Sequence, residues 1–130
     1  MLLETAHVLS SEKSILEKGV DFVGIINEHG RLEDFIGSKE IPLSRCKQEM
    51  FCMELALQNR MQKDFDDELS TTTSTIIERG ESKFVIIPTK TSKILLGIMK
   101  KEVDHTHFVN KMTSYLKSLE SCCKTSVKTK

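Results

Sequence analysis

FVGIINEHGRL, residues 22 to 32, is an apolar run that ends in a turn sequence and then begins a second apolar run. A run without alternation is typical of a central strand buried on both faces. Gly30 supplies the backbone freedom that a tight turn needs, and the chain continues with Phe35 and Ile36. The stretch therefore predicts a β-hairpin with strands at residues 22–27 and 32–36.

The segments on either side of the hairpin have helical or strand-like patterns, and their order predicts the fold class. Helices are predicted at residues 2–18, 43–69 and 105–121, and further strands at residues 70–77, 84–87 and 94–99. The order α-β-β-α-β-β-β-α predicts an α/β (α+β) fold with five strands. A chain of 130 residues has the size of one domain. We expect that domain at residues 1–121, followed by a basic tail without regular structure at residues 122–130.

The predicted middle helix carries two apolar stripes. The first stripe advances by three or four residues and consists of Leu43, Cys46, Met50, Met53, Leu57 and Met61. Phe51 and Leu55 form a second line, to the side of the first. A helix that lies on one sheet needs a single stripe, so the second predicts another packing partner. We assign self-association to Phe51, Leu55, Gln58 and Gln62, which leaves the first stripe for the sheet.

Composition excludes several classes of function. The chain has 19 basic and 19 acidic side chains, so no net field attracts it to nucleic acid or to an acidic membrane. The N-terminal residues lack the features of a signal peptide, and no apolar run is long enough to span a bilayer. We therefore expect a cytoplasmic protein without membrane association. Its four cysteines, Cys46, Cys52, Cys122 and Cys123, do not follow the pattern of a disulfide framework.

The candidate chemical sites are weak. His105 and His107 are two residues apart, so on a helix they face different directions and share a metal ion poorly. The chain contains no phosphate-binding glycine loop, dinucleotide-binding glycine motif, nucleophile elbow or HExxH zinc motif. We therefore expect no catalytic residue, no cofactor, no metal site and no enzymatic activity.

An acidic cluster lies at the predicted end of the middle helix. Its carboxylates oppose the helix dipole, and the lysine and arginine four residues before two of them offset part of that cost. A solvated helix end is the favoured interpretation, and a docking patch for a basic partner is the alternative. The cluster consists of Asp64, Asp66, Asp67 and Glu68.

The hairpin VGIINEHGRL at residues 23–32, the two-striped helix and the strands within residues 84–99 resemble the roadblock/dynein light chain family, to which longin and profilin folds are related. The resemblance covers residues 1–121. It implies a single antiparallel five-stranded sheet, with the long middle helix on one face and the terminal helices on the other. It also implies homodimers that pair their middle helices and the strands that follow, here with Thr71, Thr73 and Thr75, and that serve as platforms for small GTPases or other signalling proteins.

Residues 22–32 and 50–65 also resemble a small uncharacterised family of archaeal proteins from ammonia-oxidising lineages. That resemblance implies a prokaryotic cytoplasmic setting and brings no known activity.

Three functional hypotheses follow. The leading one is a non-enzymatic homodimeric scaffold or regulatory module that binds a protein partner. The alternative is a small-molecule sensor with a pocket between the sheet and a helix, lined by Met50, Met53 and Leu57. Nucleic-acid binding through the lysine-rich C-terminal segment ranks last, because no aromatic residues accompany the lysines.

Overall fold

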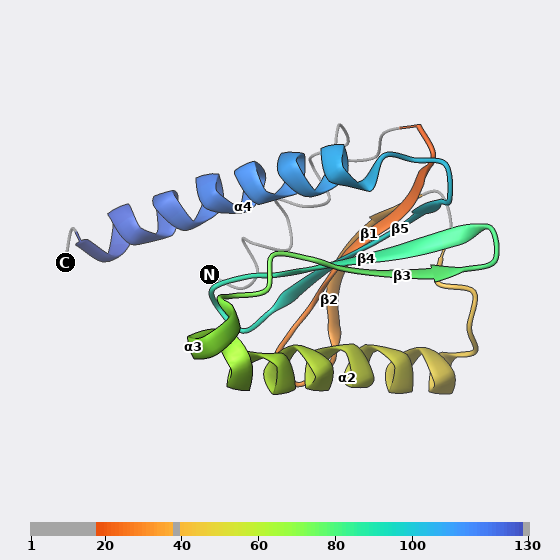
Figure 1. The fold of residues 1–130 in the computed structure, drawn as a ribbon, viewed down its shortest axis with the longest axis horizontal. Helices are drawn as coiled ribbons and strands as arrows, with labels where there is room; N and C mark the ends of the chain where they lie inside the picture. Colours follow the sequence, from red (N-terminus) through yellow and green to blue (C-terminus); the bar gives the residue numbers. More distant parts are fainter. Residues whose placement is uncertain (1–17, 38–39, 129–130) are drawn as a thin grey trace.

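The computed structural model describes residues 18–37 and 40–128, in which one antiparallel sheet lies between two helical layers (Figure 1). The strand order is β2-β1-β5-β4-β3. The strands are β1 (Val20–Ile26), β2 (Leu32–Gly37), β3 (Thr75–Arg79), β4 (Ser82–Pro88) and β5 (Ile94–Lys100). The predicted α+β fold with five strands is confirmed. The helix predicted at residues 2–18 lies almost wholly outside the described residues.

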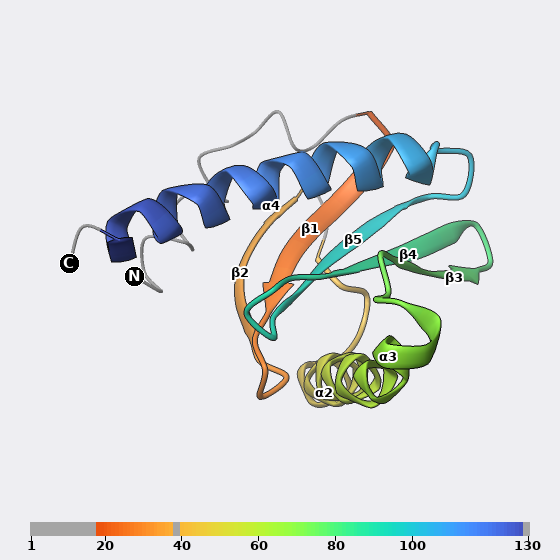
Figure 2. The same ribbon diagram turned by 60° about the vertical axis from the view of Figure 1, so that its left-hand side comes forward.

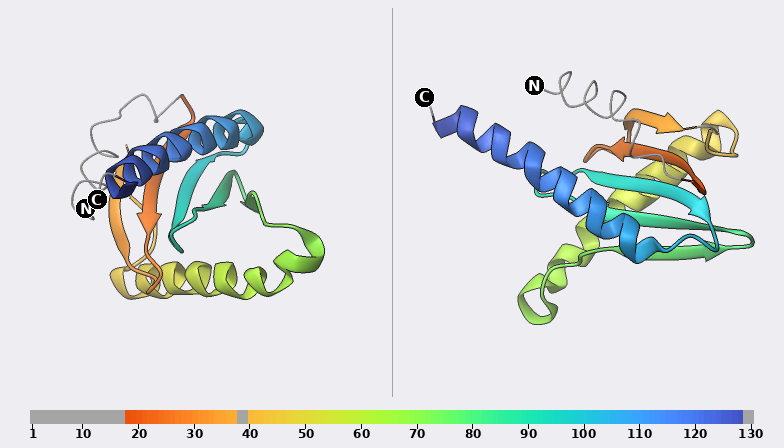
Figure 3. Two further views of the ribbon diagram at one scale, coloured as in Figure 1. Left: turned by 90° about the vertical axis from the view of Figure 1, so that its left-hand side faces the viewer. Right: turned by 90° about the horizontal axis from the view of Figure 1, so that it is seen from above.

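Helix α2 (Arg45–Gln62) covers one face of the sheet, and helix α4 (His105–Lys128) crosses the other (Figures 2 and 3). β1, β4 and β5 are buried on both faces, because their side chains alternate between the two layers. On the α4 side, Val23, Val85, Leu95 and Met99 pack with Phe108 and Met112. On the α2 side, Phe22, Phe84, Ile86, Leu96 and Ile98 pack with Cys52, Leu55 and Ala56.

The predicted first hairpin is confirmed, and Asn27 fixes its turn. The Asn27 side-chain oxygen Oδ1 accepts hydrogen bonds from the backbone N–H of His29 at 2.9 Å and of Arg31 at 3.0 Å. Gly30 has φ +82°, a conformation that costs other residues strain. A Cβ on Gly30 would lie 2.6 Å from Cα of Met53. Gly30 therefore permits both the backbone conformation of the turn and the close approach of the turn to α2.

The helix predicted at residues 43–69 is shorter in the structure, and two short helical turns follow it. Ser44 caps α2, since its Oγ accepts from the backbone N–H of Lys47 at 3.3 Å. After Gln62 the chain forms a 3₁₀ turn, η2 (Lys63–Phe65), and a single turn, α3 (Asp66–Leu69). The acidic side chains at this end oppose the α2 dipole, and none of the ion pairs in the described chain joins Arg60 to Asp64 or Lys63 to Asp67.

The strand predicted at residues 70–77 begins only at Thr75. Ser70 has φ +67° and turns the chain out of α3, and residues 71–74 form no regular structure. Ser and Thr side chains can bond to the local backbone in place of strand pairing. The β-propensity of the threonines therefore predicted a longer strand than the structure has.

Helix α4 extends beyond its predicted end at residue 121. Asp104 begins it, because its Oδ1 accepts from the backbone N–H of Thr106 at 3.0 Å. Residues 122–128, which were assigned to a tail without regular structure, continue the helix. They contain neither proline nor glycine, so nothing in that segment breaks the helical hydrogen bonds.

We expect Gly97→Ala to lower the free energy of unfolding by about 1–3 kcal/mol, measured by urea denaturation. A Cβ at this position would lie 2.7 Å from Cζ of Phe108, and that ring is fully buried under α4. The double variant Gly97→Ala/Phe108→Leu should lose less than the sum of the single changes, because the smaller side chain makes room. Strictly additive losses would contradict this account of α4 docking.

Candidate protein-interaction surface

The first apolar stripe of α2 points away from the sheet into solvent. Met50 is 63% exposed, Met53 57%, Leu57 46% and Met61 56%. Cys46 is exposed on the same side, one turn before Met50. We call these five residues the outward stripe. Soluble monomers seldom expose contiguous apolar patches of this kind, and large ones mark interaction sites.

The sheet-facing side of α2 consists of the second stripe and two small residues. The Phe51 ring meets the Phe84 ring edge to face, with centroids 5.6 Å apart. Leu55, Cys52 and Ala56 are buried in the core on this face. Phe51 and Leu55, which were predicted to mediate self-association, are therefore engaged with the sheet of their own chain: Leu55 is buried and Phe51 is half-buried.

Gln58 and Gln62, also assigned to self-association, are exposed on the flank of α2 that faces β3. They line a hollow of about 420 Å³ with Met61, Thr72 and Thr75. The hollow connects the helix to the first residue of β3. These two glutamines stay candidates for a protein contact.

β3 forms an edge of the sheet. It pairs with β4 on one side, and no described strand pairs with its other side. Thr75 is exposed on this edge, whereas Thr71 and Thr73 are exposed in the segment before the strand. An open strand edge offers unpaired backbone groups to another chain. Of the three predicted threonines, only Thr75 stands on the edge strand.

The acidic cluster is exposed and continues the apolar surface. Asp64, Asp67 and Glu68 are exposed, and Asp66 is half-buried. Phe65 and Leu69, which lie between them, are 52% and 74% exposed. Carboxylates therefore border apolar side chains at the end of α2, as at the polar rim of a protein interface.

The predicted sensor pocket is in a different place. Met50, Met53 and Leu57 line an open hollow of about 470 Å³ together with Glu28 and His29. It lies between α2 and the β1–β2 turn, not between the helix and the sheet. The correction follows from the orientation of α2, which turns these three side chains away from the sheet.

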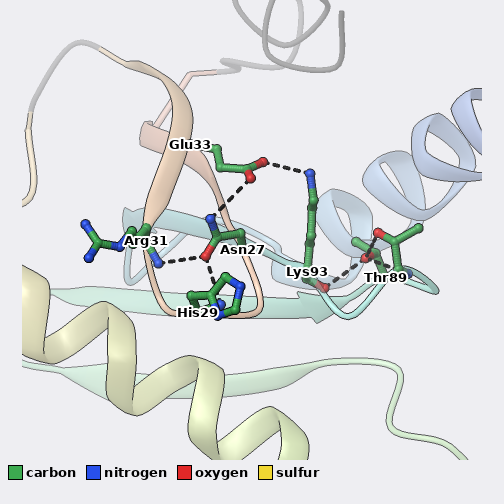
Figure 4. A network of polar contacts seen from close by, with 7 residues as sticks. Asn27, His29, Arg31, Glu33, Thr89 and Lys93 are labelled. Carbon is green, nitrogen blue, oxygen red and sulfur yellow. Dashed lines mark hydrogen bonds and ion pairs between the residues drawn. The ribbon is translucent and has the colours of Figure 1, made fainter. Parts of the chain in front are cut away.

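Two sets of polar contacts join residues far apart in the chain and were not predicted from the sequence. Lys83 is buried, and its Nζ lies 2.9 Å from Nδ1 of His105. Lys93 Nζ donates to Glu33 Oε1 at 2.7 Å, and Asn27 Nδ2 donates to Glu33 Oε2 at 3.2 Å (Figure 4). This second set, which we call the Glu33 network, fastens the β4–β5 turn to the first hairpin. The contact between Glu33 and Lys93 could have been predicted only from the pairing register of the strands.

The cysteines on α2 have opposite environments. Cys46 is exposed, whereas Cys52 is buried. Burial raises the pKa of the Cys52 thiol, because the thiolate would be poorly solvated there. In the described part of the chain, no three His, Cys, Asp or Glu side chains are grouped to hold a metal ion.

The fold is shared with solved structures of low sequence identity. A roadblock/LC7 domain from Streptomyces avermitilis superposes with a TM-score of 0.65 at 10% identity, over 86% of this chain and 93% of that one. Myxococcus xanthus MglB has a TM-score of 0.62 at 9% identity, over 91% of each chain. The LokiProfilin1–rabbit actin complex contains a match with a TM-score of 0.55 at 14% identity, over 92% of this chain and 96% of that chain.

These matches confirm the predicted roadblock- and profilin-like fold. At such identities they concern the fold alone. No protein-family model matches the sequence, and no curated protein does. Within residues 18–37 and 40–128, no helix has the length and apolar character needed to cross a membrane.

Cys46 should react with iodoacetamide in the folded protein, and Cys52 should react only after unfolding. The thiolate is the reactive form, and burial both shields Cys52 and disfavours its ionisation. Peptide mass spectrometry after labelling at about pH 7.5 distinguishes the two sites. Rapid labelling of Cys52 without denaturant would contradict the placement of this side chain against the sheet.

Glu33→Gln should lower the free energy of unfolding by about 1–2 kcal/mol, because it leaves the partly buried Lys93 ammonium without a counter-charge. Thermal or urea denaturation measures the loss. Glu33→Gln/Lys93→Met should recover part of it, since no unpaired charge then remains. A Glu33→Gln variant as stable as the parent chain would show that the network adds nothing to the fold.

Proposed function

We propose that this chain is a non-enzymatic regulatory or scaffold module that acts by binding other proteins. The outward stripe is the observation that carries the proposal. Its methionine and leucine side chains belong to neither buried cluster of the core, because the opposite side of α2 packs on the sheet. Methionine is adaptable and recurs on surfaces that bind other proteins.

The first partner that this surface fits is a second copy of the chain. The outward stripe and the β3 edge are connected through Met61, Gln62 and Thr75, so two copies can bring both together in one contact. The net charge of zero opposes no such association. The roadblock resemblance implies the same two elements, the middle helix and the strand after it.

A further protein partner then recognises the assembled module. The acidic cluster, which is Asp64, Asp66, Asp67 and Glu68, borders the apolar surface and suits a partner with basic residues. Charges at a rim steer association and set specificity more than they set affinity. The roadblock resemblance implies a small GTPase or another signalling protein as that partner.

The double variant Met53→Glu/Leu57→Glu tests self-association. Each carboxylate would have to leave water at the centre of the proposed contact, which is costly. In light scattering coupled to size exclusion, the parent chain should have twice its 14.8 kDa mass, and the variant should have the monomer mass.

Phe35→Glu is the matched control. Phe35 is a half-exposed apolar residue on β2, at the opposite edge of the sheet, so this variant should keep the dimer mass. A parent chain that is monomeric at every concentration, or a double variant that stays dimeric, would contradict the proposed contact. Circular dichroism establishes that each variant is folded.

A further inference from the structure

A cavity of about 470 Å³ beside the end of β4 is lined by residues from both helical layers. Its walls come from the end of α2, residues 71–73, the turn between β4 and β5, and the middle of α4. This volume is in the range of small-molecule sites, roughly 300–1,000 Å³. Of the residues assigned to self-association, three line it: Gln62, Thr71 and Thr73.

The cavity exists because β3 starts late. Thr75, the first residue of β3, pairs with Ile86, so Ile87 and Pro88 pair with β5 alone. Residues 70–74 instead rise from α3 toward the sheet, in the space between α2 and α4 (Figure 1). Residues 71–73, which the sequence predicted to be part of the strand, instead line the cavity.

Hydrogen bonds brace the turn that forms one wall. Thr89 Oγ1 donates to the Lys93 carbonyl oxygen at 2.9 Å, and the Thr89 N–H donates to the same oxygen at 2.9 Å. The Glu33 network ties Lys93 in turn to the first hairpin (Figure 4). A wall that is fixed before binding lowers the entropy cost of taking up a ligand.

The lining combines an apolar floor with hydroxyl groups. Ile87 is buried, and Pro88 and Leu116 are half-buried beside it. Two of the lining residues carry hydroxyl groups on separate segments, Thr72 before β3 and Thr113 on α4. An apolar surface with a few polar groups is the usual composition of a ligand site.

The cavity is basic although the chain is neutral. Among the described residues, Lys63, Lys90 and Lys117 line it with one carboxylate, Asp66, which gives this part of the lining a formal excess of two positive charges. The lysines come from η2, from the β4–β5 turn and from α4, so the fold concentrates them from three separate segments. Lysine is a point-charge donor that suits phosphate and carboxylate groups.

We propose that this cavity binds a small aliphatic organic anion, with its head group among the lysines and threonines and its chain on Ile87, Pro88 and Leu116. The described residues of the lining include no aromatic side chain, so they offer a nucleobase no stacking surface. The anionic head is a carboxylate or a phosphate, which the same ammonium and hydroxyl groups bind. The site does not depend on the self-association proposed above.

Four probes separate the head group from the aliphatic chain. Octanoate and octyl phosphate carry both parts, octanol carries only the chain, and inorganic phosphate carries only a charge. For a dissociation constant tenfold below a probe concentration of about 1 mM, the Tm of the full chain should rise by roughly 5 °C. We expect that rise from octanoate, octyl phosphate or both, and none from octanol or inorganic phosphate.

Lys63→Gln/Lys117→Gln should abolish the rise, whereas Lys47→Gln/Lys101→Gln should keep it. All four lysines are exposed, so both variants should fold. Only Lys63 and Lys117 line the cavity, so only the first variant should lose binding. In amide NMR spectra the active probe should shift signals of residues 71–73, 89 and 113.

Three results would overturn the proposal. They are an absence of stabilisation by either anion, equal stabilisation by octanol, or shifts confined to the outward stripe of α2. The last would show an amphiphile adsorbed on that exposed apolar surface and not a ligand in the cavity.

Discussion

The close packing of α2 on the sheet, through the side that carries the small residues Cys52 and Ala56, is the constraint on which the rest of the structure depends. Cys52 and Ala56 let the helix approach the branched and aromatic side chains of β1, β4 and β5, and Gly30 lets the first hairpin turn reach the helix at Met53. Once this side is buried, the bulkier stripe must face solvent. Dense packing of a helix on a sheet thus creates the exposed surface that a partner would cover.

The same arrangement connects the interaction surface to the cavity. Asn59, Gln62, Thr72 and Pro88 line both the 420 Å³ hollow beside β3 and the 470 Å³ cavity below α4. Residues 70–74 belong to neither helix nor strand, so they are the part of this region with the fewest backbone constraints. A ligand and a second chain that both contact this segment would be linked energetically, and each would change the affinity for the other.

Local sequence patterns predicted the fold, but they did not predict which side of α2 faces the sheet. The apolar runs at residues 22–26, 84–87 and 94–99 are strands, and the turn at Gly30 is where the sequence places it. Periodicity identified two stripes on α2 and could not say which one meets the sheet. The first stripe was left for the sheet, whereas in the structure the sheet-facing side carries the second stripe together with the small residues Cys52 and Ala56, both buried. Contacts between distant segments, such as Glu33 with Lys93, depend on strand register and leave no local signal.

Methionine methyl NMR with a soluble paramagnetic agent tests the orientation of α2 most directly. In dilute protein, the methyls of Met50, Met53 and Met61 should relax strongly, and those of the buried Met99 and Met112 should be protected. As the concentration rises, the three helix methyls should become protected as a second copy covers them. Helix methyls that are protected even in dilute monomer would show that this stripe packs on the sheet. Methyls that stay exposed at every concentration would show that no second copy covers it.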